Sequence, residues 1–321
     1  MRSRITWIGL SLFFLGATPA WARQHGQHAK AQAQLGRIGA RDLTKGDLDL
    51  YSPQRELAIG KAMAQQIEEL TTPLGDPPTE AYMQGLVNRI VRHSDARIPV
   101  RLRIIDSPQV DAFTLPGGYM FVNTGLILET RSEAELAGVV AHEVAHVADR
   151  DATRELTQQE VMKWMSLPLL YLGGPAGFAI HGGLALAEPL GAMAFSRHAE
   201  ERADFLGLEY LYKAGYDPEA YVDFFERLKN LGKKPKGLIA RAFASHPLTR
   251  QRIVAAQREI ERDLPPRAEY VETTSAYQNM RNRLEQLMRD QMTFISGPAT
   301  PKPPALEQDF SVKGVHSEGK R

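Results

Sequence analysis

The stretch VVAHEVAHVADR, which runs from Val139 to Arg150, places two histidines four residues apart in an otherwise apolar run. Residues at i and i+4 of an α-helix lie on one face, so His142 and His146 can direct two ring nitrogens at one ion. Glu143 is offset from His142 by about 100° and can reach a water bound to that ion. This HExxH pattern predicts two metal ligands and a general base. The alternative is a half-buried helix with ordinary polar residues.

A third metal ligand has to come from another part of the chain, because the HExxHxxGxxH extension is absent after His146. There is no Cys, so the ligand must be His, Asp or Glu. A predicted helix over residues 196–215 carries Glu200 and Asp204, four residues apart on one face. This spacing suits Glu200 as a ligand and Asp204 as the acceptor of an N–H bond from a ligating histidine. The alternative is a pair of solvated surface carboxylates.

Length and composition limit the class of protein. The chain has 321 residues, of which 43% are hydrophobic, and this is enough for one large or two small domains. Its 39 Lys and Arg residues nearly balance its 38 Asp and Glu residues, giving a formal net charge of +1. A dedicated nucleic-acid-binding protein would carry a strongly basic surface, so we expect no nucleic-acid partner.

The two ends of the sequence do not resemble folded domains. Residues 1–22 combine a basic start, a short apolar run and a small-x-small pattern ending at Ala22, which predicts a signal peptide and export. An uncleaved membrane anchor is the alternative, although the apolar run is short for a span. Residues 23–50 are polar and non-periodic and predict a flexible leader, and the proline-rich residues 296–321 predict a disordered tail.

Periodicity and capping residues between these ends predict a mostly helical α+β fold with a small, mainly antiparallel sheet. The predicted helices cover residues 52–70, 77–94, 132 to about 150, 196–215, 217–231, 245–264 and 275–294. The predicted strands cover residues 100–106, 111–115 and 119–127. We assign residues 51–264 to one domain and residues 265–295 to a C-terminal helical extension.

Residues 164–195 are strongly apolar but are interrupted by Pro168, Pro175, Pro189 and several glycines. A straight membrane span would not be broken so often. We expect a helical hairpin or a mobile lid that contacts a membrane or a substrate. A segment of the ordinary hydrophobic core fits the composition equally well.

The motifs together resemble a known family. HEVAH at 142–146 and SRHAEERAD at 196–204 resemble the HtpX/CaaX-prenyl-protease family of zinc metallopeptidases, which are gluzincins with a zincin-like fold. DAFTLPGGYMFVNTGLI (111–127) resembles the edge strand of the family and the turn before it, and SHPLTRQRI (245–253) resembles its histidine-proline segment. The predicted signal peptide and YVETTSAYQNM (270–280) resemble the soluble periplasmic, BepA-like branch, without its C-terminal helical repeats.

This resemblance implies a set of site residues. His142, His146 and Glu200 become the ligands of one Zn²⁺ per chain, Glu143 becomes the catalytic base, and Asp204 becomes the partner of a ligating histidine. His246 becomes a residue near the metal, where it either holds the transition-state oxyanion or closes the fourth coordination position. A histidine in a helix-capping loop is the alternative for His246.

The strand predicted at 119–127 is the expected peptide-binding element. An extended substrate added to it would contact Tyr119, Phe121 and Asn123. We therefore expect a periplasmic zinc endopeptidase that cleaves unfolded or misassembled envelope and outer-membrane proteins, with a possible membrane contact through residues 164–195. Two alternatives remain: a periplasmic chaperone or binding module with a plugged or regulated zinc site, and a purely structural zinc site.

Overall fold

The computed structural model describes residues 32–46, 48–172, 195–231, 246–247 and 249–295. The predicted signal peptide, the predicted tail and residues 173–194 of the apolar segment lie outside the described residues. Residues Met1–Leu284 form one compact unit, and Glu285–Arg321 form a second. The second unit contributes only the end of one helix to the described residues, so the account below concerns the first.

Helices dominate this unit, as the sequence predicts. The helices are α2 (Pro53–Leu70), α3 (Pro77–Arg92), α4 (Thr124–Glu129), α5 (Glu133–Ala148), α6 (Asp151–Leu172), α8 (Arg197–Lys213), α9 (Glu219–Leu231), α10 (Arg250–Asp263) and α11 (Ser275–Ile295). Three of the helices have serine N-caps: the Ser52, Ser132 and Ser196 side chains each accept a backbone N–H bond from the first turn of their helix. Only half of a capping box forms at Ser132, because the Glu135 carboxylate accepts the N–H of Arg131 instead of that of Ser132.

The sheet is mixed rather than mainly antiparallel. Its strands are β1 (Arg101–Ile105), β2 (Ala112–Leu115) and β3 (Tyr119–Asn123), in the order β1-β3-β2. β1 pairs with β3 in parallel and β2 pairs with β3 antiparallel. The tight turn η1 (Pro116–Gly118), with positive φ at both glycines, reverses the chain between β2 and β3. The strand nearest in sequence to β3 is therefore its antiparallel neighbour, and β1 reaches the other side of β3.

The third strand is shorter than predicted. Its pairing ends at Asn123, and Thr124–Glu129 forms α4 instead of continuing to residue 127. The loop before β2 contacts the start of α4. The Ser107 carbonyl of this loop accepts hydrogen bonds from the Thr124 hydroxyl and from the Gly125 N–H, both at 2.9 Å. A Cβ at Gly125 would stand 2.4 Å from the Pro108 carbonyl oxygen, so only glycine permits this close approach.

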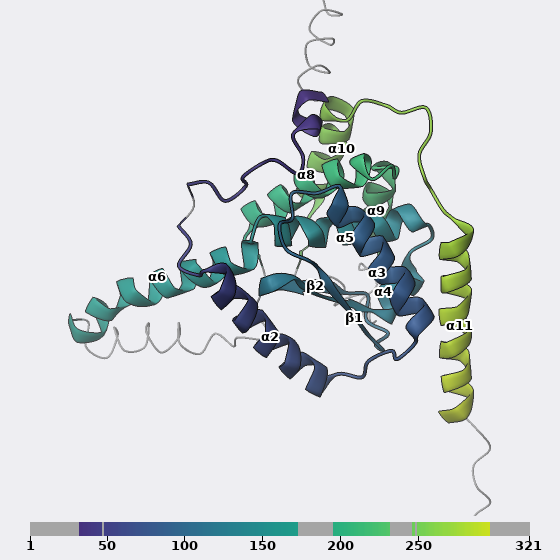
Figure 1. Cartoon of the computed structure of the whole chain (residues 1–321), viewed down its shortest axis with the longest axis horizontal. Helices are drawn as coiled ribbons and strands as arrows, with labels where there is room; N and C mark the ends of the chain where they lie inside the picture. The colour runs from purple at the N-terminus through teal and green to yellow at the C-terminus, as the bar shows by residue number, and fades with distance from the viewer. Residues whose placement is uncertain (1–31, 47, 173–194, 232–245, 248, 296–321) are drawn as a thin grey trace, which may run out of the picture. The chain divides into compact units, whose positions relative to one another are not determined.

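Helix α5 lies at the centre of the unit, and nearly all of its residues are buried (Figure 1). In the view of Figure 1, α8 and α9 lie above α5 and the sheet lies below it. The approach of α8 is close: a Cβ at Gly207 would stand 3.1 Å from both Cα and N of His142. The glycine therefore sets the spacing between the two helices that carry the motifs.

The prediction of a flexible leader over residues 23–50 is wrong for its described part. Ile38 is buried, and the Arg41 guanidinium lies 2.5 Å from Asp95 Oδ2 and 2.6 Å from Glu209 Oε2. The Gly39 N–H also donates to Asp95 Oδ1 at 2.7 Å. These long-range contacts hold the segment against the loop after α3 and against α8. They could not be predicted from hydrophobic periodicity, which describes only neighbours along the chain.

The C-terminal side of the unit also packs closely. Tyr277 on α11 is buried, and its hydroxyl donates to the Thr130 carbonyl at 2.9 Å.

The first part of the apolar segment, as far as Leu172, belongs to helix α6. Among the residues that the structure describes, no helix is both long enough and apolar enough to cross a membrane. The predicted hairpin or lid falls mostly on residues 173–194, outside the described residues.

Candidate metal centre

Four side chains from three parts of the chain converge beneath α8. His142 and His146 come from α5, Glu200 comes from the first turn of α8, and His246 precedes α10. Each offers one ligand atom, and the four atoms lie within 4.8 Å of one another. All four residues are at most 2% exposed. Four buried polar groups that face one another in this way need a shared partner or a dense set of mutual contacts.

The shortest distances within the cluster join the ring nitrogens and the Glu200 carboxylate. His142 Nε2 lies 3.1 Å from His146 Nε2 and 3.3 Å from His246 Nδ1. Glu200 Oε1 lies 2.8 Å from His246 Nδ1 and 3.7 Å from His146 Nε2. The structure thus brings together all three ligands that the sequence predicts, with His246 as a fourth group.

Glu143 faces the same space from a different angle. The Thr114 hydroxyl on β2 donates to its Oε2 at 3.1 Å. Its other oxygen, Oε1, lies 3.3 Å from His246 Nε2, and neither atom has a hydrogen-bond partner among the described residues. One oxygen of this buried carboxylate is therefore held by a hydrogen bond, and the other has no hydrogen-bond partner among the described residues. Thr114 was missed by the sequence reasoning, because its contact with Glu143 crosses from a strand to a helix.

His142 has a buried carboxylate behind it. Its Nδ1 lies 3.1 Å from Asp204 Oδ1, the contact that the sequence predicts, and 3.1 Å from the Tyr221 hydroxyl. Arg252 on α10 donates to both oxygens of Asp204, at 2.6 and 2.7 Å, and its Nη1 lies 2.5 Å from Glu200 Oε2. A hydrogen bond at Nδ1 leaves Nε2 as the atom that faces the cluster. Tyr221 and Arg252 come from distant helices and were not predicted.

The pKa values of these groups reflect their contacts. Burial opposes ionisation of Asp204, but bonds from Arg252 and His142 outweigh it and lower its pKa to about 2. The pKa of Glu200 also lies well below its usual range, since contacts with His142 and His246 outweigh burial. Burial disfavours the charged form of His142, yet Asp204 and Glu200 raise its pKa to about 9. Ionised carboxylates around converging imidazoles are an environment suited to a cation.

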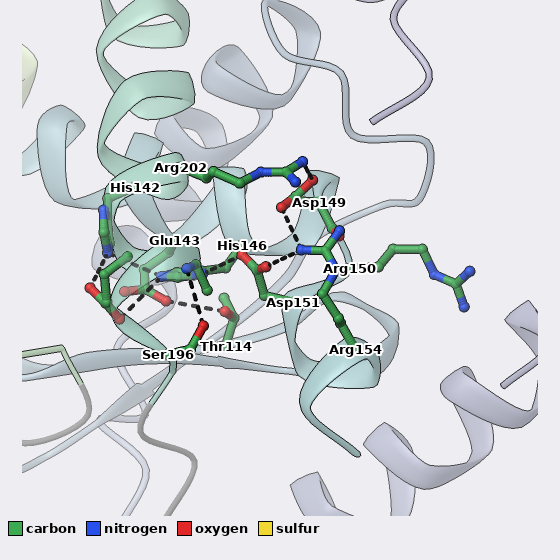
Figure 2. Close-up of polar contacts among 12 residues, drawn as sticks. Thr114, His142, Glu143, His146, Asp149, Arg150, Asp151, Arg154, Ser196 and Arg202 are labelled. Atoms are coloured by element: carbon green, nitrogen blue, oxygen red, sulfur yellow. Dashed lines mark hydrogen bonds and ion pairs between the residues drawn. The ribbon is translucent and has the colours of Figure 1, made fainter. Parts of the chain in front are cut away.

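His146 has different neighbours. Its Nδ1 lies 2.8 Å from Asp151 Oδ2, and its ring stacks on Phe195 with centroids 4.0 Å apart. Figure 2 shows Asp151 beside His146. Burial, together with the nearby His142 and His246, lowers the pKa of His146. Sequence reasoning missed Asp151, because a spacing of five residues does not place two side chains on one helical face.

The donor set fits zinc. Two or three imidazole nitrogens and one carboxylate oxygen are ligands that Zn²⁺ accepts, and the His₂Glu set is one of its known catalytic combinations. The orphaned atoms Glu143 Oε1 and His246 Nε2 lie at the edge of this cluster, where a bound water or substrate oxygen would satisfy them. Glu200 adds a buried negative charge that suits a cation. Asp204 and Asp151 contact the Nδ1 atoms of His142 and His146, as carboxylates commonly do behind the histidine ligands of zinc.

The expected peptide-binding strand does not lie at an edge. β3 is paired on both sides, so an extended peptide cannot add to it, and the prediction of strand addition there is wrong. Phe121 and Asn123 are buried, and Tyr119 is half-buried. None of the three is among the ligand residues. The edge strand next to α5 is β2, which carries Thr114. Hydrophobic alternation identifies strands but does not give their order in a sheet.

Comparisons with known proteins agree on a family. The model of peptidase family M48 matches residues 77–260. A putative beta-barrel assembly-enhancing protease of Vibrio cholerae is 31% identical over 66% of this chain and 45% of its own length. The beta-barrel assembly-enhancing protease of Escherichia coli is 26% identical over 63% of this chain and 43% of its own length. The mitochondrial metalloendopeptidase OMA1 of Schizosaccharomyces pombe is 32% identical over 69% of this chain and 66% of its own length.

These matches confirm the resemblance that the motifs indicate. The chain spans less than half the length of the beta-barrel assembly-enhancing proteases that it matches. The region matched by the family model covers more than half of the chain and contains His142, His146, Glu200 and His246. With the HExxH helix and the Glu200 helix packed into one buried cluster inside that region, the chain belongs to peptidase family M48.

Proposed function

We propose that this protein is a zinc-dependent endopeptidase. The observation that carries the proposal is the buried group of His142, His146 and Glu200 beside a Glu143 carboxylate with one free oxygen. These three residues would hold the ion. When bound, zinc supplies Lewis-acid polarisation of a carbonyl oxygen and lowers the pKa of bound water.

In this proposal the residues of the chain move the protons. Glu143 accepts the proton of the attacking water at Oε1 and later donates it to the leaving amine. The Thr114 hydroxyl holds Oε2, so the carboxylate does not need to reorient during the reaction. The Asp204 and Asp151 carboxylates hold the Nδ1 sides of His142 and His146. Burial of the whole cluster keeps these interactions strong.

We propose that substrates bind along β2. It is the edge strand next to α5 among the described residues, and its Thr114 contacts the proposed base. An extended peptide that paired with this edge would lie along the side of the sheet that reaches Glu143. Only a chain with free backbone groups can pair in this way, which favours unfolded substrates over native ones.

We further propose that the substrates are misassembled proteins of the bacterial envelope, including outer-membrane proteins, and that the enzyme works in the periplasm. Two observations support this. Residues 1–22 have the pattern of a signal peptide. Two of the relatives described above are named as proteases that enhance beta-barrel assembly.

A Glu143→Gln variant tests the mechanism. Glutamine keeps the shape of the side chain but cannot accept the proton, so we expect zinc content to remain near one per chain and casein cleavage to fall by at least about a hundredfold. Zinc analysis and a casein assay on both proteins measure this. Cleavage by the variant at the wild-type rate would show that Glu143 is not the base.

His246 favours a second candidate function, a plugged or regulated site in a protein that binds rather than cleaves. Its Nδ1 lies 2.8 Å from Glu200 Oε1, inside the group of four possible ligands, where it would occupy the position that a water needs. A His246→Ala variant distinguishes the two. We expect it to cleave casein faster than wild type if the site is plugged. If both proteins bind zinc and both are inactive, a binding function is favoured.

A further inference from the structure

The two histidines of α5 differ in how their outer nitrogens are held. His142 Nδ1 contacts Asp204, which lies on α8 at the spacing that the sequence motif predicts. His146 Nδ1 contacts Asp151, which lies on the same chain segment just after α5 has ended. Asp151 and His146 are 0% and 2% exposed. A contact of 2.8 Å between two such buried groups fixes the orientation of the imidazole.

The turn between α5 and α6 makes this contact possible. Arg150 has a φ of 54°, and among the described residues it is the only one other than glycine with a positive φ. A left-handed residue breaks the helical path between α5 and α6, and Asp151, the first residue of α6, can then direct its carboxylate at His146. Such a conformation costs an arginine free energy, and surrounding contacts must hold it in place.

Contacts of the Arg150 side chain hold the turn from outside. Its guanidinium forms ion pairs with Asp49 and with Glu56, the latter at 2.6 Å, and donates to the Tyr51 carbonyl at 3.0 Å. Figure 2 shows this side chain directed away from the histidines. The residues that precede α2 and the first turn of α2 therefore clamp the turn in its left-handed form.

Contacts of Asp149 and Arg154 hold the turn from inside. Arg154 Nη1 lies 2.8 Å from Asp149 Oδ2 and 2.7 Å from Asp151 Oδ1, so one guanidinium bridges both carboxylates (Figure 2). Arg202 on α8 forms a second ion pair with Asp149. Asp151 thus gives one oxygen to Arg154 and the other to His146. Both carboxylates are fully buried and bound to arginine, but only Asp151 touches a histidine.

We propose that Asp151 is the positioning residue of His146, and that the turn from Asp149 to Asp151, held by these ion pairs, keeps the Asp151 carboxylate at His146 Nδ1. This inference rests on the proposed function, because it assumes that His146 binds the metal through Nε2. A carboxylate at Nδ1 fixes the tautomer that leaves Nε2 as the ligand atom and makes the imidazole a stronger donor. Removing such a partner in other zinc sites costs 10–100-fold in metal affinity.

The test is the rate at which zinc leaves the protein. Wild type, Asp151→Asn and Asp151→Ala are loaded with one zinc, and transfer to an excess of a chromogenic chelator is followed. Asparagine can still accept the Nδ1–H bond but has no charge, whereas alanine has neither. We expect transfer to be fastest from Asp151→Ala and intermediate from Asp151→Asn, with the alanine variant about 10–100-fold faster than wild type. The visible spectrum of the cobalt-substituted proteins should change in the same order.

Asp149→Asn is the matched control. It removes the charge of a buried carboxylate in the same turn that also pairs with Arg154, but it leaves the contact between Asp151 and His146 intact. We expect this variant to unfold at lower denaturant concentration than wild type, while its zinc release rate and cobalt spectrum stay close to those of wild type.

The outcomes separate the alternatives. If Asp149→Asn releases zinc as fast as Asp151→Asn, the turn acts only through general stability and the inference is wrong. It is also wrong if neither Asp151 variant differs from wild type. Should Asp151→Ala fail to fold, the comparison of the two asparagine variants still decides. A wild-type protein that binds no stoichiometric zinc would overturn the proposed function and this inference together.

Discussion

Glu143 is held at one oxygen and free at the other, and a single hydroxyl creates this difference. Thr114 is buried and donates to Oε2, while Oε1 has no partner among the described residues. A hydrogen bond to a charged group contributes about 1.5–3 kcal/mol. At the scale of the residue, Thr114 therefore sets the direction in which the proposed base points.

A Thr114→Val variant removes this hydroxyl without changing the volume of the side chain much. We expect kcat for peptide cleavage to fall by roughly tenfold, with little change in KM, because the proposed base loses its orientation. Steady-state kinetics measure the two constants separately. Thr130→Val is the control, since Thr130 is equally buried but bonds to Ile127 and Tyr277, away from the cluster. Equal losses of kcat in both variants would contradict the role of Thr114.

At the scale of the element, the site depends on how closely α8 approaches α5. His142 and Glu200 belong to different helices, and Gly207 of α8 lies against the backbone of His142 on α5. Backbone atoms of His142 cannot move aside for a new side chain as a flexible side chain could. The distance between the ligands is therefore set by a residue that is not itself a ligand.

A Gly207→Ala variant tests this spacing. The added Cβ would stand 3.1 Å from His142 Cα, so we expect the free energy of unfolding to fall by about 1–3 kcal/mol. Gly85→Ala on α3 is the control, because nothing lies within 4 Å of its new Cβ and alanine favours the helix. Denaturant unfolding should place the two variants on opposite sides of wild type. If both are more stable than wild type, α5 and α8 tolerate the extra atom.

At the scale of the whole molecule, the segment before α2 is part of the fold. Arg41 lies between Asp95 and Glu209, whose side chains are at most 3% exposed, and it satisfies both carboxylates. The same segment continues to Asp49 and Tyr51, which hold Arg150 next to the cluster. Folding of this segment and formation of the site are thus linked through ion pairs.

An Arg41→Met variant leaves two buried carboxylates without their cation. We expect the free energy of unfolding to fall by about 3–5 kcal/mol, the usual result of removing one partner of a buried ion pair. Arg103→Met is the control: Arg103 pairs with Glu68, but both side chains are largely exposed, so the loss should stay below about 1 kcal/mol. Equal changes in chemical denaturation would mean that the segment is not anchored by Arg41.

Features that depend on neighbours along the chain could be predicted from the sequence. The spacing of His142 and His146, the caps at Ser132 and Ser196 and the extents of most helices follow from local geometry, which repeats every 3.6 residues. Glu200 and Asp204 could be placed on one face for the same reason. Three strands were also predicted, but their order was not, because alternation does not say which strands are neighbours.

The sequence by itself determined most of the helices, which of their faces carry imidazole and carboxylate groups, and which family the chain resembles. Only the tertiary structure decided which strand lies between the other two, that Thr114 holds Glu143, and that Asp151 holds His146. It also decided that Arg41 anchors the supposed leader. The physical reason is that helical periodicity is a property of one segment, whereas a buried charge is satisfied by whichever distant group the packing brings within reach.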